Sequence, residues 1–161
     1  MKSFLKKIRF YSAHIIITLI CINDSIFINT WIAPGPIINI KYILIFYFSF
    51  FEKERLSITF LFLLGLIFDS LQGMPLGLTS ICFIVLNKIA IFLKMRRTLT
   101  NFQNEFIAFL TSLLVTQIVS IIIFNYFSQN SFEYFLLAIN IIVTSIFYPA
   151  IRQILKIFYF H

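Results

Sequence analysis

Four ionisable side chains lie inside long apolar runs of the sequence: Asp24, Lys41, Asp69 and Lys88. Charged groups are costly in lipid, and where they occur they often mark a functional site. Two carboxylates on facing helices, such as Asp24 and Asp69, form the kind of pair that an intramembrane acid–base enzyme needs. The structural alternative for Asp24, Lys41 and Lys88 is pairing, for example Asp24 with Lys41, or placement near a membrane surface where a lysine extends toward water.

Other signatures of catalysis do not occur in the sequence. The two histidines are His14, inside the first apolar run, and His161, the last residue. No HExxH motif, nucleophile triad or Gly-rich phosphate loop is present. Cys21 and Cys82 lie in apolar stretches without a CxxC neighbour, which predicts buried thiols. The sequence therefore predicts a protein that is not an enzyme and has no cofactor or metal site.

Asp69 belongs to a regular series of small residues, in which Gly65, Asp69, Gly73 and Gly77 follow one another at intervals of four. On one helix this spacing forms a slowly turning stripe, and small residues let two helices approach closely in lipid. Pro75 interrupts a continuous helix, so a tight turn is expected around Gly73 and Pro75. Asp69 would then either belong to a packing face or accept hydrogen bonds from backbone N–H groups freed at the turn.

The composition requires lipid as the solvent for most of the chain. The 161 residues are 60% hydrophobic and only 12% charged, whereas a soluble domain carries about 25% charged residues. The net charge of +7 is divided among short clusters between apolar runs, which argues against a nucleic-acid-binding surface. We therefore expect an all-α integral membrane protein.

Six apolar runs predict about six transmembrane helices in a single polytopic domain that covers residues 1–161. A span needs about 20 helical residues, and the second and third runs are shorter than that. The third and fourth runs can alternatively form a short or re-entrant hairpin. The expected runs are residues 11–33, 37–51, 56–71, 75–93, 106–127 and 134–151.

The basic residues indicate the orientation of these runs. If the N-terminus is cytoplasmic, 11 of the 13 Lys and Arg residues fall on the cytoplasmic side, as the positive-inside rule requires. Lys88 is expected near the inner end of the fourth run, and Lys41 toward the outside. Both termini are then cytoplasmic. The 11 residues are Lys2, Lys6, Lys7, Arg9, Lys53, Arg55, Lys94, Arg96, Arg97, Arg152 and Lys156.

The stretch LGLIFDSLQGMPLGLTSICFIVLNKIAIF (64–92) resembles the signature of the rod shape-determining protein MreD family. The second run, PIINIKYILIFYFSFF, and the Tyr148-Pro149 pair in the last run are similar to that family in a weaker way. The resemblance implies that the motif positions are Gly65, Asp69, Gly73, Pro75 and Gly77.

That family implies a non-enzymatic scaffold of the bacterial cytoplasmic (inner) membrane that acts in cell elongation. The implied partners are membrane lipid, an MreC-type single-pass membrane protein, the MreB-type cytoskeleton and peptidoglycan-synthesis enzymes, with no nucleic acid. The family is also similar in fold to the solute-binding membrane subunits of vitamin transporters. This alternative predicts a small-molecule cavity lined by Trp31, Asp24 or Asn29. A channel is disfavoured because no run has a continuous polar face.

Overall fold

The protein is all-helical in the part of the chain that the structure describes, as the sequence predicts. The structure is a computed structural model, and it describes residues 14–22, 38–51, 56–96, 101–127 and 134–160. Residues 14–22 form a helix that precedes five longer elements. These are α2 (Ile40–Phe51), α3 (Ile58–Gln72), α4 (Leu78–Arg96), α5 (Phe102–Phe127) and α6 (Tyr134–Phe160).

Three of these helices are long and apolar enough to cross a membrane. The qualifying segments are Leu78–Met95 in α4, Phe102–Phe127 (the whole of α5) and Leu137–Ile157 in α6. The helices α2 and α3 are apolar but shorter, with 12 and 15 residues. At 1.5 Å per residue they are about 18 and 22 Å long, less than the ~30 Å hydrocarbon layer.

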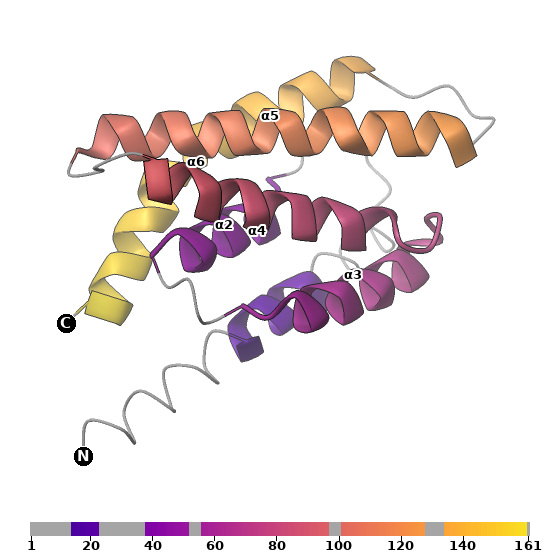
Figure 1. Cartoon of the computed structure of the whole chain (residues 1–161), viewed down its shortest axis with the longest axis horizontal. Coiled ribbons are helices and arrows are strands. Elements are labelled where there is room, and N and C mark those ends of the chain that lie inside the picture. Colours follow the sequence, from indigo (N-terminus) through magenta and orange to yellow (C-terminus); the bar gives the residue numbers. More distant parts are fainter. Residues whose placement is uncertain (1–13, 23–37, 52–55, 97–100, 128–133, 161) are drawn as a thin grey trace.

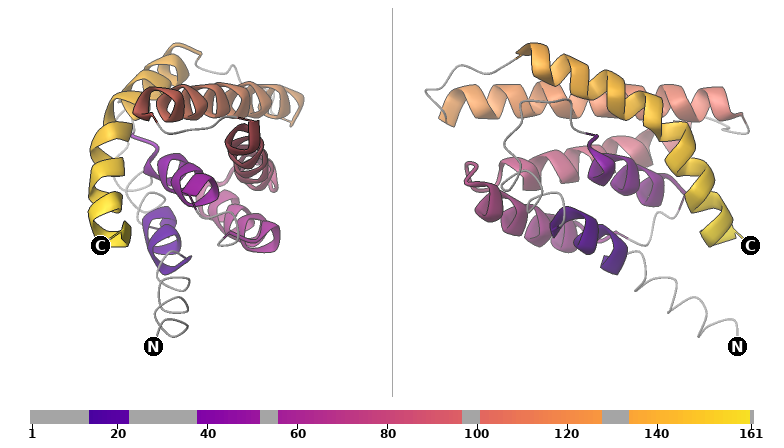
Figure 2. Two further views of the ribbon diagram at one scale, coloured as in Figure 1. Left: turned by 60° about the vertical axis from the view of Figure 1, so that its left-hand side comes forward. Right: turned by 180° about the vertical axis from the view of Figure 1, so that it is seen from behind.

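The short helix α2 forms the centre of the bundle. All ten residues from Lys41 to Phe50 are buried, and Figure 2 (left) shows α2 in the middle, with α3, α4, α5, α6 and the 14–22 helix around it. A helix that is apolar all round is stable when other helices cover every face. The other helices cover α2, so none of these ten residues faces lipid even though α2 is shorter than the hydrocarbon layer.

Helix α4 makes the most extensive packing contacts, with α3, α5 and α2. Figure 1 shows α3, α4 and α5 one above another, with α2 behind α4. Hydrogen bonds between polar groups join α4 to α2 and to α3, and the Cys82 thiol of α4 donates to the Thr116 carbonyl of α5 at 4.0 Å. Asn87 Nδ2 donates to Ser49 Oγ of α2 at 2.7 Å, and Ser80 Oγ donates to the Phe62 carbonyl of α3 at 2.9 Å. Hydrogen bonds between helices help to hold bundles together in lipid, where apolar contacts alone give little preference.

Several predicted helix boundaries are corrected, among them the start of the fifth run, which is predicted at residue 106, whereas α5 begins at Phe102. The fourth apolar run was expected to begin at Pro75, but α4 begins at Leu78 and extends to Arg96. The sixth run is predicted to end at residue 151, but α6 extends to Phe160, with Pro149 inside it. Proline removes one backbone hydrogen bond and bends a helix without necessarily ending it. Figure 2 (right) shows α6 running along α5 and then turning away from it.

One end of the bundle gathers basic residues. The C-terminal end of α4, the start of α5 and the C-terminal end of α6 lie together on the left of Figure 1. The sequence places Lys94, Arg152 and Lys156 toward this end of the described helices. Lys94 Nζ donates to the Phe51 carbonyl at 3.1 Å, so that a lysine of α4 caps the last turn of α2.

Candidate functional site

The turn between α3 and α4 is built around two glycines with positive φ. Gly73 ends α3 with φ 64°, and its N–H donates to the Asp69 carbonyl. Gly77 has φ 96°, and the next residue, Leu78, donates its N–H to the Pro75 carbonyl at 3.2 Å. Other residue types rarely adopt these conformations because of the Cβ atom. The two glycines therefore set the reversal of the chain.

The Asp69 carboxylate caps the start of α4 across this turn. Its Oδ2 accepts a hydrogen bond from Gly77 N at 2.8 Å, and both of its oxygens accept from Thr79 N, at 3.1 and 3.2 Å. The first N–H groups of a helix have no partner within the helix, and a negative charge there is favoured by the helix dipole. Asp69 is 0% exposed, and these are the hydrogen bonds expected of a cap.

Only one glycine of the predicted packing stripe lies at a helix contact. A Cβ atom on Gly65 would collide with the backbone N and Cα of Ser80 in α4, whereas no atom lies within 4 Å of such a Cβ on Gly73 or Gly77. The predicted packing stripe is therefore confirmed at Gly65 and wrong at Gly73, which instead lies in the turn that the sequence also predicts there. Close approach requires a small residue on the second helix as well, and Ser80, which is fully buried, is that residue.

We expect Gly65→Ala to lower the free energy of unfolding by about 1–3 kcal/mol, because overpacking at a tight contact forces the backbones apart. Unfolding in mild detergent by titration with a denaturing detergent measures this change. Ser70→Ala is the matched control, since it also places an alanine in α3 but at an exposed position. Equal stability of Gly65→Ala and wild type would contradict the close contact between α3 and α4.

The other intramembrane charges take different positions. Lys41 is only 5% exposed, and its Nζ lies 3.7 Å from the centre of the Phe68 ring, so of the two alternatives for this side chain, extension toward water is wrong, and pairing with Asp24 lies outside the described residues. Lys88 is exposed, and because α4 continues to Arg96 it lies near the middle of the helix instead of at one end. Asp24 lies outside the described residues, as do Trp31 and Asn29 of the solute-cavity alternative.

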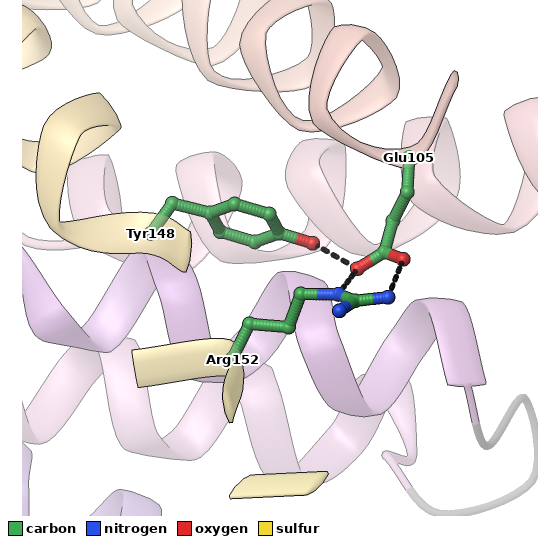
Figure 3. Close-up of polar contacts among 3 residues, drawn as sticks. All are labelled: Glu105, Tyr148 and Arg152. Carbon is green, nitrogen blue, oxygen red and sulfur yellow. Dashed lines mark hydrogen bonds and ion pairs between the residues drawn. The ribbon is translucent and has the colours of Figure 1, made fainter. Parts of the chain in front are cut away.

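A second buried charged group, which the sequence reasoning missed, joins α5 to α6. Glu105 Oε1 accepts from Tyr148 Oη at 2.6 Å and from Arg152 Nε at 2.5 Å, and Glu105 Oε2 accepts from an Arg152 terminal nitrogen at 2.6 Å. Figure 3 shows the tyrosine and arginine of α6 both directed at the glutamate of α5. This is a two-point arginine–carboxylate pair with a phenolic hydroxyl added, a geometry that gives strong and directional hydrogen bonds.

Aromatic rings surround this Glu105 cluster, which we define as Glu105, Tyr148 and Arg152. The Tyr148 ring stacks on Phe109 with centroids 4.2 Å apart, and the Arg152 guanidinium lies 5.0 Å from the centre of the Phe102 ring. Glu105 is 5% exposed and Tyr148 is 0% exposed. A charge removed from water to this degree is stable only with close partners, and the cluster supplies them.

A signal for the Glu105 cluster was present in the sequence. Helices α5 and α6 are separated by a short connection, residues 128–133, so they are expected to be antiparallel neighbours. Glu105 precedes this connection by about as many residues as Arg152 follows it. In two antiparallel helices, residues at equal distances before and after the connection lie side by side. Glu105 and Arg152 are therefore expected to be neighbours. The predicted fifth run begins at residue 106 and therefore leaves Glu105 outside the helix, and Arg152 is counted only among the basic residues of the cytoplasmic side.

The described residues thus define a helical membrane protein whose two described carboxylates both serve the fold. Asp69 caps α4, and Glu105 pairs with α6. No group of three or more His, Cys, Asp or Glu side chains that could hold a metal ion occurs among the described residues, and both cysteines are buried as free thiols, as predicted. Comparison with protein-family models, curated proteins and solved structures finds no match.

Proposed function

We propose that this protein is a non-enzymatic, multi-pass component of the bacterial cytoplasmic membrane that acts in the cell-elongation (rod-shape) machinery. The observation that carries the proposal is the stretch 64–92, which resembles the MreD family and forms one continuous structural unit. In this unit Gly65 permits the contact with α4, Gly73 and Gly77 set the turn, and Asp69 caps the next helix. Each of these four motif residues serves the shape of the hairpin.

The engagement of the two carboxylates that the structure describes supports a role without catalysis. Asp69 and Glu105 are buried, and their oxygens accept hydrogen bonds from the protein itself. A general acid or base must instead reach a substrate within hydrogen-bond distance. A bundle whose described carboxylates are engaged within the fold is suited to hold partners in place.

The basic end of the bundle supports the proposed orientation, with both termini in the cytoplasm. Lys and Arg side chains near the inner surface attract anionic lipid, each by about 1 kcal/mol. The same end would face a cytoskeletal partner of the MreB type and, directly or through it, wall-synthesis enzymes. An MreC-type single-pass protein would bind a lateral face of the bundle.

Depletion of the protein in the bacterium that encodes it tests this proposal. We expect cells to widen and to lose peptidoglycan incorporation along the side wall, measured with a fluorescent D-amino acid label. A plasmid copy should restore both properties, and a copy with Asp69→Leu should not, because the start of α4 loses its cap. Ser70→Ala is again the matched control, since Ser70 is exposed and its hydroxyl donates only within α3, to the Leu66 carbonyl.

Cells that keep their width and side-wall incorporation after depletion would refute the cell-shape role. If the Asp69→Leu copy restores cell width and side-wall incorporation at normal protein level, the role in cell shape does not require the hairpin motif. Immunoblotting of the membrane fraction supplies the protein level for each variant.

A further inference from the structure

Helix α4 has one narrow stripe that the other described helices leave uncovered. Its exposed residues are Ile81, Lys88, Phe92 and Met95, while Val85, in the same stripe, is half-buried. Successive members of this stripe are four or three residues apart, the spacing by which one helix packs along another. All members except Lys88 are apolar. Within the described residues, the Lys88 ammonium has no hydrogen bond or ion pair.

The depth of Lys88 separates it from both membrane surfaces. Lys88 follows Leu78, the first residue of α4, by ten residues and precedes Arg96, the last, by eight, so its Cα lies about 15 and 12 Å from the two helix ends. A fully extended lysine side chain reaches roughly 6 Å. Its Cα–Cβ bond also tilts toward the N-terminus of the helix, away from the nearer end. In a membrane that α4 crosses over its full length, the ammonium would therefore stop short of the lipid headgroups on both sides.

A partner of opposite sign stabilises a charge at this depth. The chain's own described carboxylates, Asp69 and Glu105, are buried and engaged in the fold, so they are inaccessible to Lys88 of a second copy. The described part of the chain therefore offers Lys88 no counter-charge. A carboxylate that another membrane protein presents at the same depth would supply it.

We propose that the exposed stripe of α4 binds a transmembrane helix of a partner protein, and that this helix carries an Asp or Glu near its centre. The apolar members of the stripe supply the helix-packing surface, and Lys88 supplies the polar contact. A single charged residue within an apolar packing stripe also fixes the register of the two helices. This inference does not depend on the cell-shape role, because it rests on the position and exposure of Lys88, on its apolar neighbours in the stripe and on the engagement of the described carboxylates.

Model peptides in vesicles test the proposal. The purified protein, labelled with a donor fluorophore, is reconstituted in phosphatidylcholine with acceptor-labelled Leu/Ala transmembrane peptides that carry Glu, Gln or Leu at the centre. We expect the Glu peptide to associate about 3- to 30-fold more tightly than the Leu peptide, the range that polar contacts between helices produce in lipid. Lys88→Met should remove this preference.

Lys156→Met is the matched control, because Lys156 is also exposed but lies near the end of α6. It removes the same charge and should leave the preference for the Glu peptide unchanged. Since Lys88 makes no polar contact within the described residues, Lys88→Met should retain the helical circular dichroism and the unfolding midpoint of wild type, or raise the midpoint.

Three results would overturn the proposal. The first is equal association of the Glu and Leu peptides with the wild-type protein. The second is an equal loss of the preference in both lysine variants, which indicates a general charge effect. The third is loss of the Glu-peptide preference when phosphatidylglycerol replaces part of the phosphatidylcholine, which would assign Lys88 to anionic lipid.

Discussion

Replacing Asp69 with leucine is expected to lower the free energy of unfolding by about 3 kcal/mol, because the N–H groups of Gly77 and Thr79 lose their shared acceptor and each unsatisfied buried donor costs about 1–3 kcal/mol. Asp69→Asn keeps one acceptor oxygen at the same place and should cost about 1 kcal/mol. Unfolding of the purified protein in mild detergent, titrated with a denaturing detergent, measures both values.

The neighbouring exposed residue provides the control for this experiment. Ser70→Leu adds an apolar side chain one position further along α3, on the exposed side of the helix, and should change the stability by less than about 0.5 kcal/mol. Equal losses in Asp69→Asn and Asp69→Leu would show that the negative charge itself is required. That result would contradict the interpretation of Asp69 as a cap whose oxygens matter more than its charge.

Breaking the Glu105 cluster is expected to have an effect of similar or larger size. Glu105→Leu leaves the Arg152 guanidinium without its carboxylate and the buried Tyr148 hydroxyl without its acceptor. Removing one partner of a buried ion pair costs about 3–5 kcal/mol. The expected result is a large fall in the unfolding midpoint, together with loosening of α6 against α5, measured by proteolysis of the C-terminal half of α6.

A double-mutant cycle separates the pair from its surroundings. Arg152→Met alone leaves a buried carboxylate, whereas the combined Glu105→Leu and Arg152→Met variant leaves an apolar contact. We expect the combined variant to lose clearly less stability than the sum of the two single variants, because buried pairs are often replaceable by packed apolar residues. Gln103→Leu, at an exposed position of α5, is the control. Additive losses would mean that the pair makes no energetic coupling between α5 and α6.

The helical class of the fold and the α3–α4 turn could be predicted from the sequence because both depend on nearby residues. Long apolar runs favour helices in lipid whatever their neighbours. Gly73, Pro75 and Gly77 determine the turn through their own backbone preferences. Asp69 lies only a few positions before these three residues, so its capping role was available from the local pattern alone.

The roles of individual charges were less predictable, because burial depends on which helix covers which face. Lys41 and Lys88 are alike in sequence, as single lysines inside apolar runs. Lys41 belongs to α2, which other helices surround, and it is buried against Phe68. Lys88 lies on the stripe of α4 that the other described helices leave uncovered.

The sequence by itself determined that this is a chain of apolar helices with a capped turn at its most recognisable motif, since composition and local backbone preferences suffice for that. Only the tertiary structure decided that α2 is enclosed, that Glu105 pairs with Arg152, and that Lys88 faces outward. Glu105 and Arg152 are 47 positions apart in the chain. The packing of whole helices, which no local pattern specifies, brings such residues together or leaves them exposed.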